Sequence, residues 1–190
     1  MDIPIKQTND ANARASKVRL VVFDVDGVLT SGQIAIGKDG EVMKEFFVQD
    51  GLGIAVTQRA GIKTAIITGR ESEMVRLRSA ELKICDVYQG TLDKQTALRE
   101  LMDKHGLGVE EVAYVGDDLN DLPALVQVGF ACGVANSVPE VAQRCHYISA
   151  HRGGGGGVRD VLEFILRSQG LWDGIVQSYV EGSGQQHTRQ

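Results

Sequence analysis

The stretch "VRLVVFDVDGVLT", residues 18–30, places two aspartates directly after an apolar, β-branched run. Such a run is typical of a strand that is buried inside a sheet. Asp24 and Asp26 stand two residues apart, and Gly27 lets the chain turn just beyond them. A simple Asp-Gly turn would explain this pattern without any chemistry. A second acidic group at the end of another strand would instead indicate a functional site.

Strands and helices alternate along the rest of the chain. The patterns predict strands at 63–69, 85–90, 111–118, 130–135 and 146–150, helices at 51–61, 71–83, 94–106, 121–129, 137–145 and 158–170, and a hairpin within 33–48. This order is typical of an α/β fold. We therefore expect a Rossmann-like three-layer sandwich with a mostly parallel sheet and a small β-hairpin.

The chain of 190 residues is long enough for one domain. Residues 1–16 are polar and are expected to be disordered or frayed, and 173–190 to form a tail that is flexible or docks on a neighbouring subunit. The domain itself is assigned to 17–172. The net charge of −5 argues against nucleic acid or an anionic membrane as a partner.

The sequence also carries hints about the compartment. Three scattered cysteines without CxxC spacing suggest a reducing environment and no structural zinc site. We find neither an apolar signal segment nor an apolar run long enough to span a bilayer. We therefore expect a cytoplasmic protein that does not enter membranes.

Polar residues follow three of the predicted strands. They are Asp24 and Asp26, then Thr68 and Gly69, then Asp117 and Asp118. In parallel sheets these strand ends meet at one edge, where ligands bind. Two acidic groups there would repel each other unless a cation lies between them. Carboxylate and carbonyl oxygens suit Mg²⁺, so the acidic residues at these strand ends, Asp24, Asp26, Asp117 and Asp118, are candidate ligands.

This arrangement suits phosphoryl transfer. Asp24 is placed to attack phosphorus, and Asp26 to protonate the leaving alkoxide and later deprotonate water. Thr68 would donate a hydrogen bond to the phosphate, and the amides of 25–28 would cradle its oxygens. Lys94 begins a predicted helix and would neutralise Asp24 and a phosphate oxygen, although it could equally be an ordinary surface lysine.

Four motifs, "DVDGVLT", "ITG", "QGTLDK" and "GDDLND", resemble in order those of the haloacid dehalogenase-like phosphatase superfamily. The resemblance covers Val18 to about Trp172. It implies that Asp24 is the nucleophile, Asp26 the acid/base, Thr68 the phosphate-binding threonine and Lys94 the active-site lysine. It also implies that Asp117 binds the metal. Asp118 and Asp121 are each able to assist Asp117. Residues 30–67 and 70–93 are too short to hold a cap domain, so either a large substrate or another subunit must cover the site.

Longer segments, "FFVQDGLG", "ITGR", "YQGTLDK", "GDDLNDLP" and "GGGGGVRDVLEFIL", closely resemble the 3-deoxy-D-manno-octulosonate 8-phosphate phosphatases. The resemblance implies a Mg²⁺-dependent enzyme of lipopolysaccharide synthesis that has no cap domain. It also implies a homotetramer, in which a neighbour's hairpin and C-terminal tail cover each active site. The substrate contacts implied by the resemblance are Asp26, Phe47, Val48, Gln49, Asp50, Gly51, Gly69, Arg70, Arg78 and Lys94. Arginine is common in the family where this chain has Gln49 and Ala55, and we expect Arg59, four residues after Ala55 on one helix face, to compensate in part.

Several alternatives remain at this point. The glycines at 153–157 would bind phosphate at a helix start, form a flexible linker, or carry the tail into a neighbouring subunit. The substrate could be a related nine-carbon sugar acid phosphate, or the chain could be a non-catalytic oligomerisation domain like that of sialic acid nucleotidyltransferases. A receiver domain is disfavoured because its phosphorylated aspartate normally ends the third strand, not the first.

Overall fold

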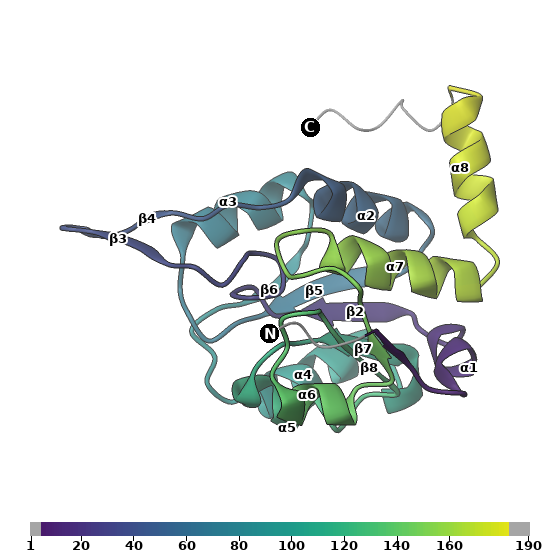
Figure 1. Cartoon of the computed structure of the whole chain (residues 1–190), viewed down its shortest axis with the longest axis horizontal. Coiled ribbons are helices and arrows are strands. Elements are labelled where there is room, and N and C mark those ends of the chain that lie inside the picture. Colours follow the sequence, from purple (N-terminus) through teal and green to yellow (C-terminus); the bar gives the residue numbers. More distant parts are fainter. Residues whose placement is uncertain (1–4, 183–190) are drawn as a thin grey trace.

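The computed structural model describes residues 5–182, which form a seven-stranded sheet between two layers of helices (Figure 1). The strand order is β1-β9-β8-β7-β2-β5-β6, and every neighbouring pair is parallel except β1 with β9. The strands are β1 (Lys6–Gln7), β2 (Leu20–Phe23), β5 (Lys63–Ile67), β6 (Asp86–Tyr88), β7 (Val112–Val115), β8 (Phe130–Gly133) and β9 (Tyr147–Ile148). The predicted mostly parallel α/β sandwich is confirmed.

Side chains of β2 alternate between the two faces of the sheet, as a strand period of two requires. Val21 and Phe23 pack in one core, and Leu20 and Val22 in the other. The first core is covered by α1 (Ala11–Ala15), α2 (Val48–Arg59), α3 (Glu73–Glu81), α7 (Gly157–Ser168) and the start of α8 (Trp172–Val180). The second is covered by α4 (Lys94–His105), α5 (Leu122–Leu125) and α6 (Pro139–Arg144). Because both faces are buried, β2 reads as a continuous apolar run.

The predicted hairpin is β3 (Ala35–Gly37) paired with β4 (Gly40–Met43). It extends away from the body of the molecule (Figure 1). Between β2 and β5 lie only this hairpin and α2, and between β5 and α4 only α3 and β6. The fold therefore carries no cap domain in these segments, as expected.

The prediction of a frayed N-terminus is wrong for residues 5–16; residues 1–4 lie outside the described part of the chain. β1 pairs with β9, and the Lys6 ammonium donates to the carbonyl of Ala142 at 3.0 Å. Ala11 and Ala15 of α1 are fully buried. This segment is ordered because two small apolar side chains, four residues apart, form one buried helix face.

Two element boundaries differ from the sequence patterns. Helix α2 begins at Val48 rather than residue 51, so part of "FFVQDG" belongs to its first turn. The helix predicted at 121–129 reduces to the four residues of α5, preceded by the short 3₁₀ helix η2 (Leu119–Asp121). A second 3₁₀ turn, η1 (Val109–Glu111), leads into β7.

The lengths of the helices and the burial of the cysteines bear on membranes and disulfides. Among residues 5–182, no helix has the length and apolar character needed to cross a bilayer. Cys85 is exposed, Cys132 and Cys145 are buried, and all three are free thiols.

Candidate active site

The carboxyl ends of β2, β5 and β7 open into a cavity of about 280 Å³. Its wall consists of Asp24, Asp26, Gly32, Thr68, Gly69, Arg70, Asp117, Asp118 and Asn120. Asp24 follows β2, Thr68 follows β5 and Asp117 closely follows β7. The pairing of β2 with both β5 and β7 therefore places the three predicted strand-end groups together.

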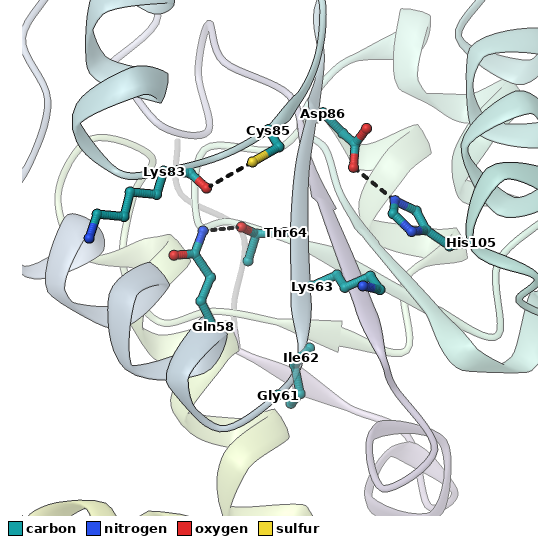
Figure 2. A pocket seen from close by; sticks show the side chains of 9 residues that line it. All are labelled: Gln58, Gly61, Ile62, Lys63, Thr64, Lys83, Cys85, Asp86 and His105. Atoms are coloured by element: carbon teal, nitrogen blue, oxygen red, sulfur yellow. Dashed lines mark hydrogen bonds and ion pairs between the residues drawn. The ribbon is translucent and has the colours of Figure 1, made fainter.

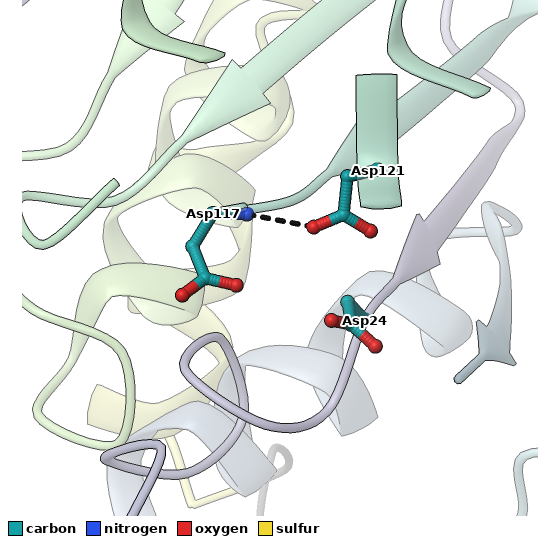
Figure 3. A group of neighbouring side chains, drawn as sticks. All are labelled: Asp24, Asp117 and Asp121. Carbon is teal, nitrogen blue, oxygen red and sulfur yellow. Dashed lines mark hydrogen bonds between the residues drawn. The ribbon is translucent and has the colours of Figure 1, made fainter. Parts of the chain in front are cut away.

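Three carboxylates form the floor of this site. Oxygens of Asp24, Asp117 and Asp121 all lie within 4.8 Å of one another (Figure 3). Asp121 is fully buried. Its Oδ1 accepts hydrogen bonds from Lys94 Nζ at 2.7 Å and the Tyr114 hydroxyl at 2.9 Å, and its Oδ2 accepts from the Asp117 amide at 2.9 Å. Asp121 is thus an anchor for its neighbours.

Asp118 has a different position from Asp121. Its Oδ1 accepts from the Leu119 amide at 2.7 Å, which caps η2, and the residue lines the cavity. Sequence reasoning left the two aspartates equivalent. In the structure Asp118 is an exposed residue that caps η2, whereas Asp121 is buried and accepts hydrogen bonds from its neighbours.

The Asp117 carboxylate lies directly over the Gly27 Cα. A Cβ at Gly27 would lie 2.0 Å from Asp117 Oδ2, and Gly27 has φ +93°. Asn136 completes this contact, since its Nδ2 donates to the Gly27 carbonyl at 2.9 Å and lies 3.4 Å from Asp117 Oδ2. Sequence reasoning missed Asn136, whose only signal was its position shortly after the strand β8.

Two carboxylate oxygens in the cluster are buried without a hydrogen-bond donor among the described residues: Asp24 Oδ1 and Asp117 Oδ1. Lys94 Nζ lies 3.1 Å from Asp24 Oδ1 as an ion pair, without hydrogen-bond geometry. Buried acceptors of this kind are costly unless a cation or donor meets them. Asp24 and Asp117 therefore fit a hard divalent cation such as Mg²⁺, which prefers oxygen ligands.

Burial and neighbouring carboxylates raise the pKa values of two aspartates in the cluster. Burial, and then the carboxylates of Asp121 and Asp24, raise the pKa of Asp117 to about 8. Burial and then Asp121 raise the pKa of Asp24 to about 6, although the Lys94 ammonium opposes this change. A cation between the two carboxylates would lower both pKa values again.

Lys94 is not a surface lysine. It is the first residue of α4, and its side chain is 1% exposed. Its ammonium bridges Asp24 at 3.1 Å and Asp121 at 2.7 Å. Asp93 caps the same helix by accepting from the Thr96 amide at 3.1 Å, which fixes the start of α4. The predicted ion pair with Asp24 is present.

Asp26 lines the same cavity but is not one of the three clustered carboxylates. It is ion-paired with Lys44, and its Oδ2 lies 3.9 Å from Arg70 Nε. Lys44 in turn lies 2.9 Å from Glu41 Oε1. The predicted role of Asp26 as a metal ligand stays a prediction. Sequence reasoning missed Lys44 and Glu41 entirely.

The other residues predicted to contact substrate fall into two groups. Gly69 and Arg70 line the cavity, and the Arg70 side chain is half exposed. The segment at the start of α2 does not line the cavity within this chain; Phe47, Val48 and Gln49 are exposed there, whereas Asp50 and Gly51 are buried.

Asp50 and Arg78 make contacts inside the protein. Asp50 Oδ1 accepts from the Arg159 amide at 2.7 Å, at the start of α7, and burial raises the pKa of Asp50 to about 6. The Arg78 guanidinium pairs with Glu81 at 2.7 Å and lies over the Phe46 ring at 5.9 Å. Their predicted contacts with substrate stay predictions, because neither residue lines the cavity.

Arg59 lies at the other end of α2. Its guanidinium donates to the Tyr179 hydroxyl of α8 and lies over that ring at 5.5 Å. The structure therefore does not bring Arg59 to the cavity. The expectation that it compensates for Ala55 fails because the cavity lies beyond the opposite end of the sheet.

The glycine run at 153–157 is not a flexible linker. The Gly154 amide donates to the Val28 carbonyl at 3.1 Å, and the Gly153 amide donates to Asn136 Oδ1 at 2.7 Å. A Cβ at Gly153 would lie 1.8 Å from the Gly27 carbonyl oxygen. The glycines allow this loop to pack directly against the backbone that follows Asp24.

A larger cavity of about 430 Å³ lies at the opposite edge of the sheet, by the first residues of β5 and β6 (Figure 2). Its polar groups pair with each other or with nearby residues: Gln58 donates to Thr64 at 2.7 Å, and His105 Nε2 lies 2.8 Å from Asp86. Burial would raise the pKa of Asp86, but hydrogen bonds from Lys104 and His105 lower it. This cavity lacks the unpaired acceptors of the acidic site.

Comparison with known proteins shows the family to which the chain belongs. Residues 74–162 match the family model of the haloacid dehalogenase-like hydrolases. The 3-deoxy-D-manno-octulosonate 8-phosphate phosphatase KdsC of Escherichia coli strain B is 43% identical over 164 residues, 86% of this chain and 87% of that protein.

Solved structures agree. The Moraxella catarrhalis phosphatase of the same name, solved in complex with magnesium, phosphate and KDO, is 41% identical, with TM-score 0.88 over 91% of this chain and 99% of that one. The cobalt-bound Haemophilus influenzae phosphatase is 39% identical, with TM-score 0.81 over 83% and 92% of the two chains. On this identity and coverage, the chain belongs to the 3-deoxy-D-manno-octulosonate 8-phosphate phosphatase family of haloacid dehalogenase-like hydrolases.

Proposed function

We propose that this protein is a Mg²⁺-dependent phosphatase that hydrolyses 3-deoxy-D-manno-octulosonate 8-phosphate to the free sugar acid and phosphate. The reaction would proceed through an aspartyl-phosphate on Asp24 and serve lipopolysaccharide biosynthesis in the cytoplasm. The observation that carries the proposal is the pair of buried carboxylates in the cavity, Asp24 and Asp117, whose Oδ1 atoms accept no hydrogen bond from the described residues. The choice of substrate is supported by the names of the related phosphatases.

In the first step an Asp24 oxygen attacks phosphorus, and the ester bond to the sugar breaks. Lys94 holds Asp24 by its ion pair, and Asp121 holds Lys94. Thr68 and the amides of 25–27 would donate to the phosphate oxygens, whereas the Val28 amide already donates to the Val25 carbonyl at 3.2 Å. A bound Mg²⁺, held by Asp24 and Asp117, would offset the repulsion between nucleophile and phosphate.

Asp26 would manage the protons. It protonates the departing sugar alkoxide, and afterwards takes a proton from the water that attacks the aspartyl-phosphate. That attack releases phosphate and regenerates the Asp24 carboxylate. The half-exposed Arg70 is available for the sugar's own carboxylate, where a guanidinium makes strong charge-assisted hydrogen bonds.

We further propose that a homotetramer completes the site. The cavity is open, and the chain has no cap to exclude water from it. The projecting hairpin exposes Ile36, Val42 and Met43, which is the kind of apolar surface that binds another subunit. A neighbour's hairpin or tail would then bring the start of α2 and the substrate together; residues 183–190 of the predicted tail lie outside the described residues.

A related nine-carbon sugar acid phosphate is the second candidate substrate. Gln49 and Ala55 replace arginines common in the family, so helix α2 offers fewer cations for an eight-carbon acid. This candidate keeps the same chemistry and changes only the pathway.

Phosphate release from a panel of sugar acid phosphates, with Mg²⁺ or EDTA, tests the proposal. We expect Mg²⁺-dependent turnover of the eight-carbon substrate that Asp24→Asn abolishes. Preference for a nine-carbon acid would reassign the substrate. Failure of the wild type on the whole panel, in the presence of Mg²⁺, would favour the non-catalytic oligomerisation domain.

A further inference from the structure

Lys44 is a buried charge that the predicted chemistry does not use. It directly follows the hairpin strand β4, yet its side chain is 1% exposed. Its ammonium meets the carboxylate of Asp26 and lies 2.9 Å from Glu41 Oε1. A buried ammonium is tolerated when carboxylates compensate for its lost hydration. Lys44 is therefore held in one place by two opposite charges.

The anchor of this ion pair is itself fixed. The Ser72 hydroxyl donates to Glu41 Oε2, and the Ser72 amide donates to Gln89 Oε1 at 2.8 Å. Ser72 directly precedes α3, in the loop that follows β5 and also contains Arg70. The chain of contacts from Ser72 through Glu41 and Lys44 to Asp26 thus ties the base of the hairpin to two loops of the cavity.

The contacts leave the two oxygens of Asp26 in different surroundings. Oδ1 is bound by Lys44, whereas Oδ2 lies 3.9 Å from the half-exposed Arg70 guanidinium. A carboxylate fixed at one oxygen can present the other to a substrate in a defined direction. Proton transfer is sensitive to such placement, since a misplacement of about 1 Å can cost on the order of 100-fold in rate.

We propose that Lys44 is a positioning residue for the acid/base Asp26. This inference rests on the proposed function and extends it, because it assigns a role to a hairpin residue outside the four motifs. Lys44 does not itself contact the reacting atoms. It holds Asp26 Oδ1, so that Oδ2 faces the cavity.

A double-mutant cycle tests the proposal with 3-deoxy-D-manno-octulosonate 8-phosphate as substrate. Lys44→Met keeps the length of the side chain and removes its charge. We expect kcat to fall about 100-fold with KM changed less than about threefold, as for a misplaced acid/base group. In the Asp26→Asn background the same change should have no further effect on kcat, because its target is gone. Lys44→Arg should recover part of the loss.

Two further measurements separate positioning from folding. Lys104→Met, at a 57% exposed lysine that pairs with Asp86 at the opposite edge of the sheet, is the matched control and should keep wild-type kinetics. With p-nitrophenyl phosphate, whose leaving group needs no proton, Lys44→Met should retain a burst of p-nitrophenolate followed by slow turnover. A burst also proves that the variant is folded and still forms the phospho-enzyme.

The outcomes are distinct. An unchanged kcat for Lys44→Met would overturn the inference, as would an equal loss in the wild-type and Asp26→Asn backgrounds. Loss of the burst would assign Lys44 a structural role instead. Absence of wild-type turnover of both phosphates would overturn the proposed function, and this inference with it.

Discussion

Gly27 is the position where a single methyl group should disable the site. Its φ of +93° costs a non-glycine residue about 1–2 kcal/mol. In addition, a Cβ there would lie 2.0 Å from Asp117 Oδ2. Because ordinary contacts need about 3.5 Å, the carboxylate must move by more than about 1 Å. Mg²⁺ accepts ligands only near 2.0–2.1 Å, so we expect Gly27→Ala to lose the metal.

Thermal unfolding with and without Mg²⁺ measures this loss. At about 100 times its Kd, a ligand stabilises the native state by about 2.7 kcal/mol. For a domain of this size that corresponds to a rise in Tm of roughly 5–10 °C. Gly27→Ala should show less than about 2 °C of this rise, and its Mg²⁺-dependent phosphate release should fall with it.

Gly61 provides a matched control for backbone strain. It has φ +89°, and a Cβ at this position would meet no atom within 4 Å, so Gly61→Ala carries the same strain without the contact. Its Tm should fall, but its response to Mg²⁺ should equal that of the wild type. In an Asp117→Ala background, Gly27→Ala should cost no more stability than Gly61→Ala. A full Mg²⁺ response in Gly27→Ala would refute the reasoning.

Three other predictions follow from the same geometry. Lys94→Met leaves Asp24 and Asp121 without their shared ammonium and should lower the free energy of unfolding in urea by about 3–5 kcal/mol. Lys104→Met, at a 57% exposed lysine, should lower it by less than about 1 kcal/mol. Equal losses in the two variants would contradict this prediction. In EDTA the free energy of unfolding should fall as pH rises from about 4 to about 8, because folding raises the pKa of Asp24 to about 6 and of Asp117 to about 8. Excess Mg²⁺ should remove that fall. A rise in the free energy of unfolding across this pH range would refute the prediction. Gly153→Ala should lower the free energy of unfolding by about 1–3 kcal/mol through overpacking, and should also lower kcat. Gly155→Ala, whose Cβ would meet nothing closer than 3.5 Å, should change neither stability nor kcat. Equal effects of the two substitutions would show that the contact of Gly153 with Gly27 is unimportant.

The sheet and the three strand-end groups were predictable because their signals are local. Buried parallel strands read as apolar runs, and their ends share one edge of the sheet. Asp24, Thr68 and Asp117 could therefore be assigned to one site before any contact was known. The same rule supplied Lys94 only as a candidate, since the start of a helix does not reveal whether a lysine is buried.

Other features depend on partners that are distant in sequence. Lys44 lies at the end of a solvent-exposed hairpin, where lysines are normally exposed, and its side chain is buried because it pairs with Asp26 and Glu41. The N-terminal segment is ordered because β1 finds an edge strand, β9, near the other end of the domain. A glycine run likewise suggests flexibility until the backbone that it must approach is known, here that of Gly27.

Charge balance explains why the site needs a divalent ion in particular. Three carboxylates, those of Asp24, Asp117 and Asp121, meet the one ammonium of Lys94 in this cluster. The donors that surround Asp121 are otherwise neutral, so an excess of negative charge remains. Without a metal the chain can reduce that excess only by binding protons, which is why burial and the neighbouring carboxylates raise the pKa of Asp117 to about 8. A doubly charged cation would balance the excess directly and would keep Asp24 ionised, which is the state that a nucleophile requires at neutral pH.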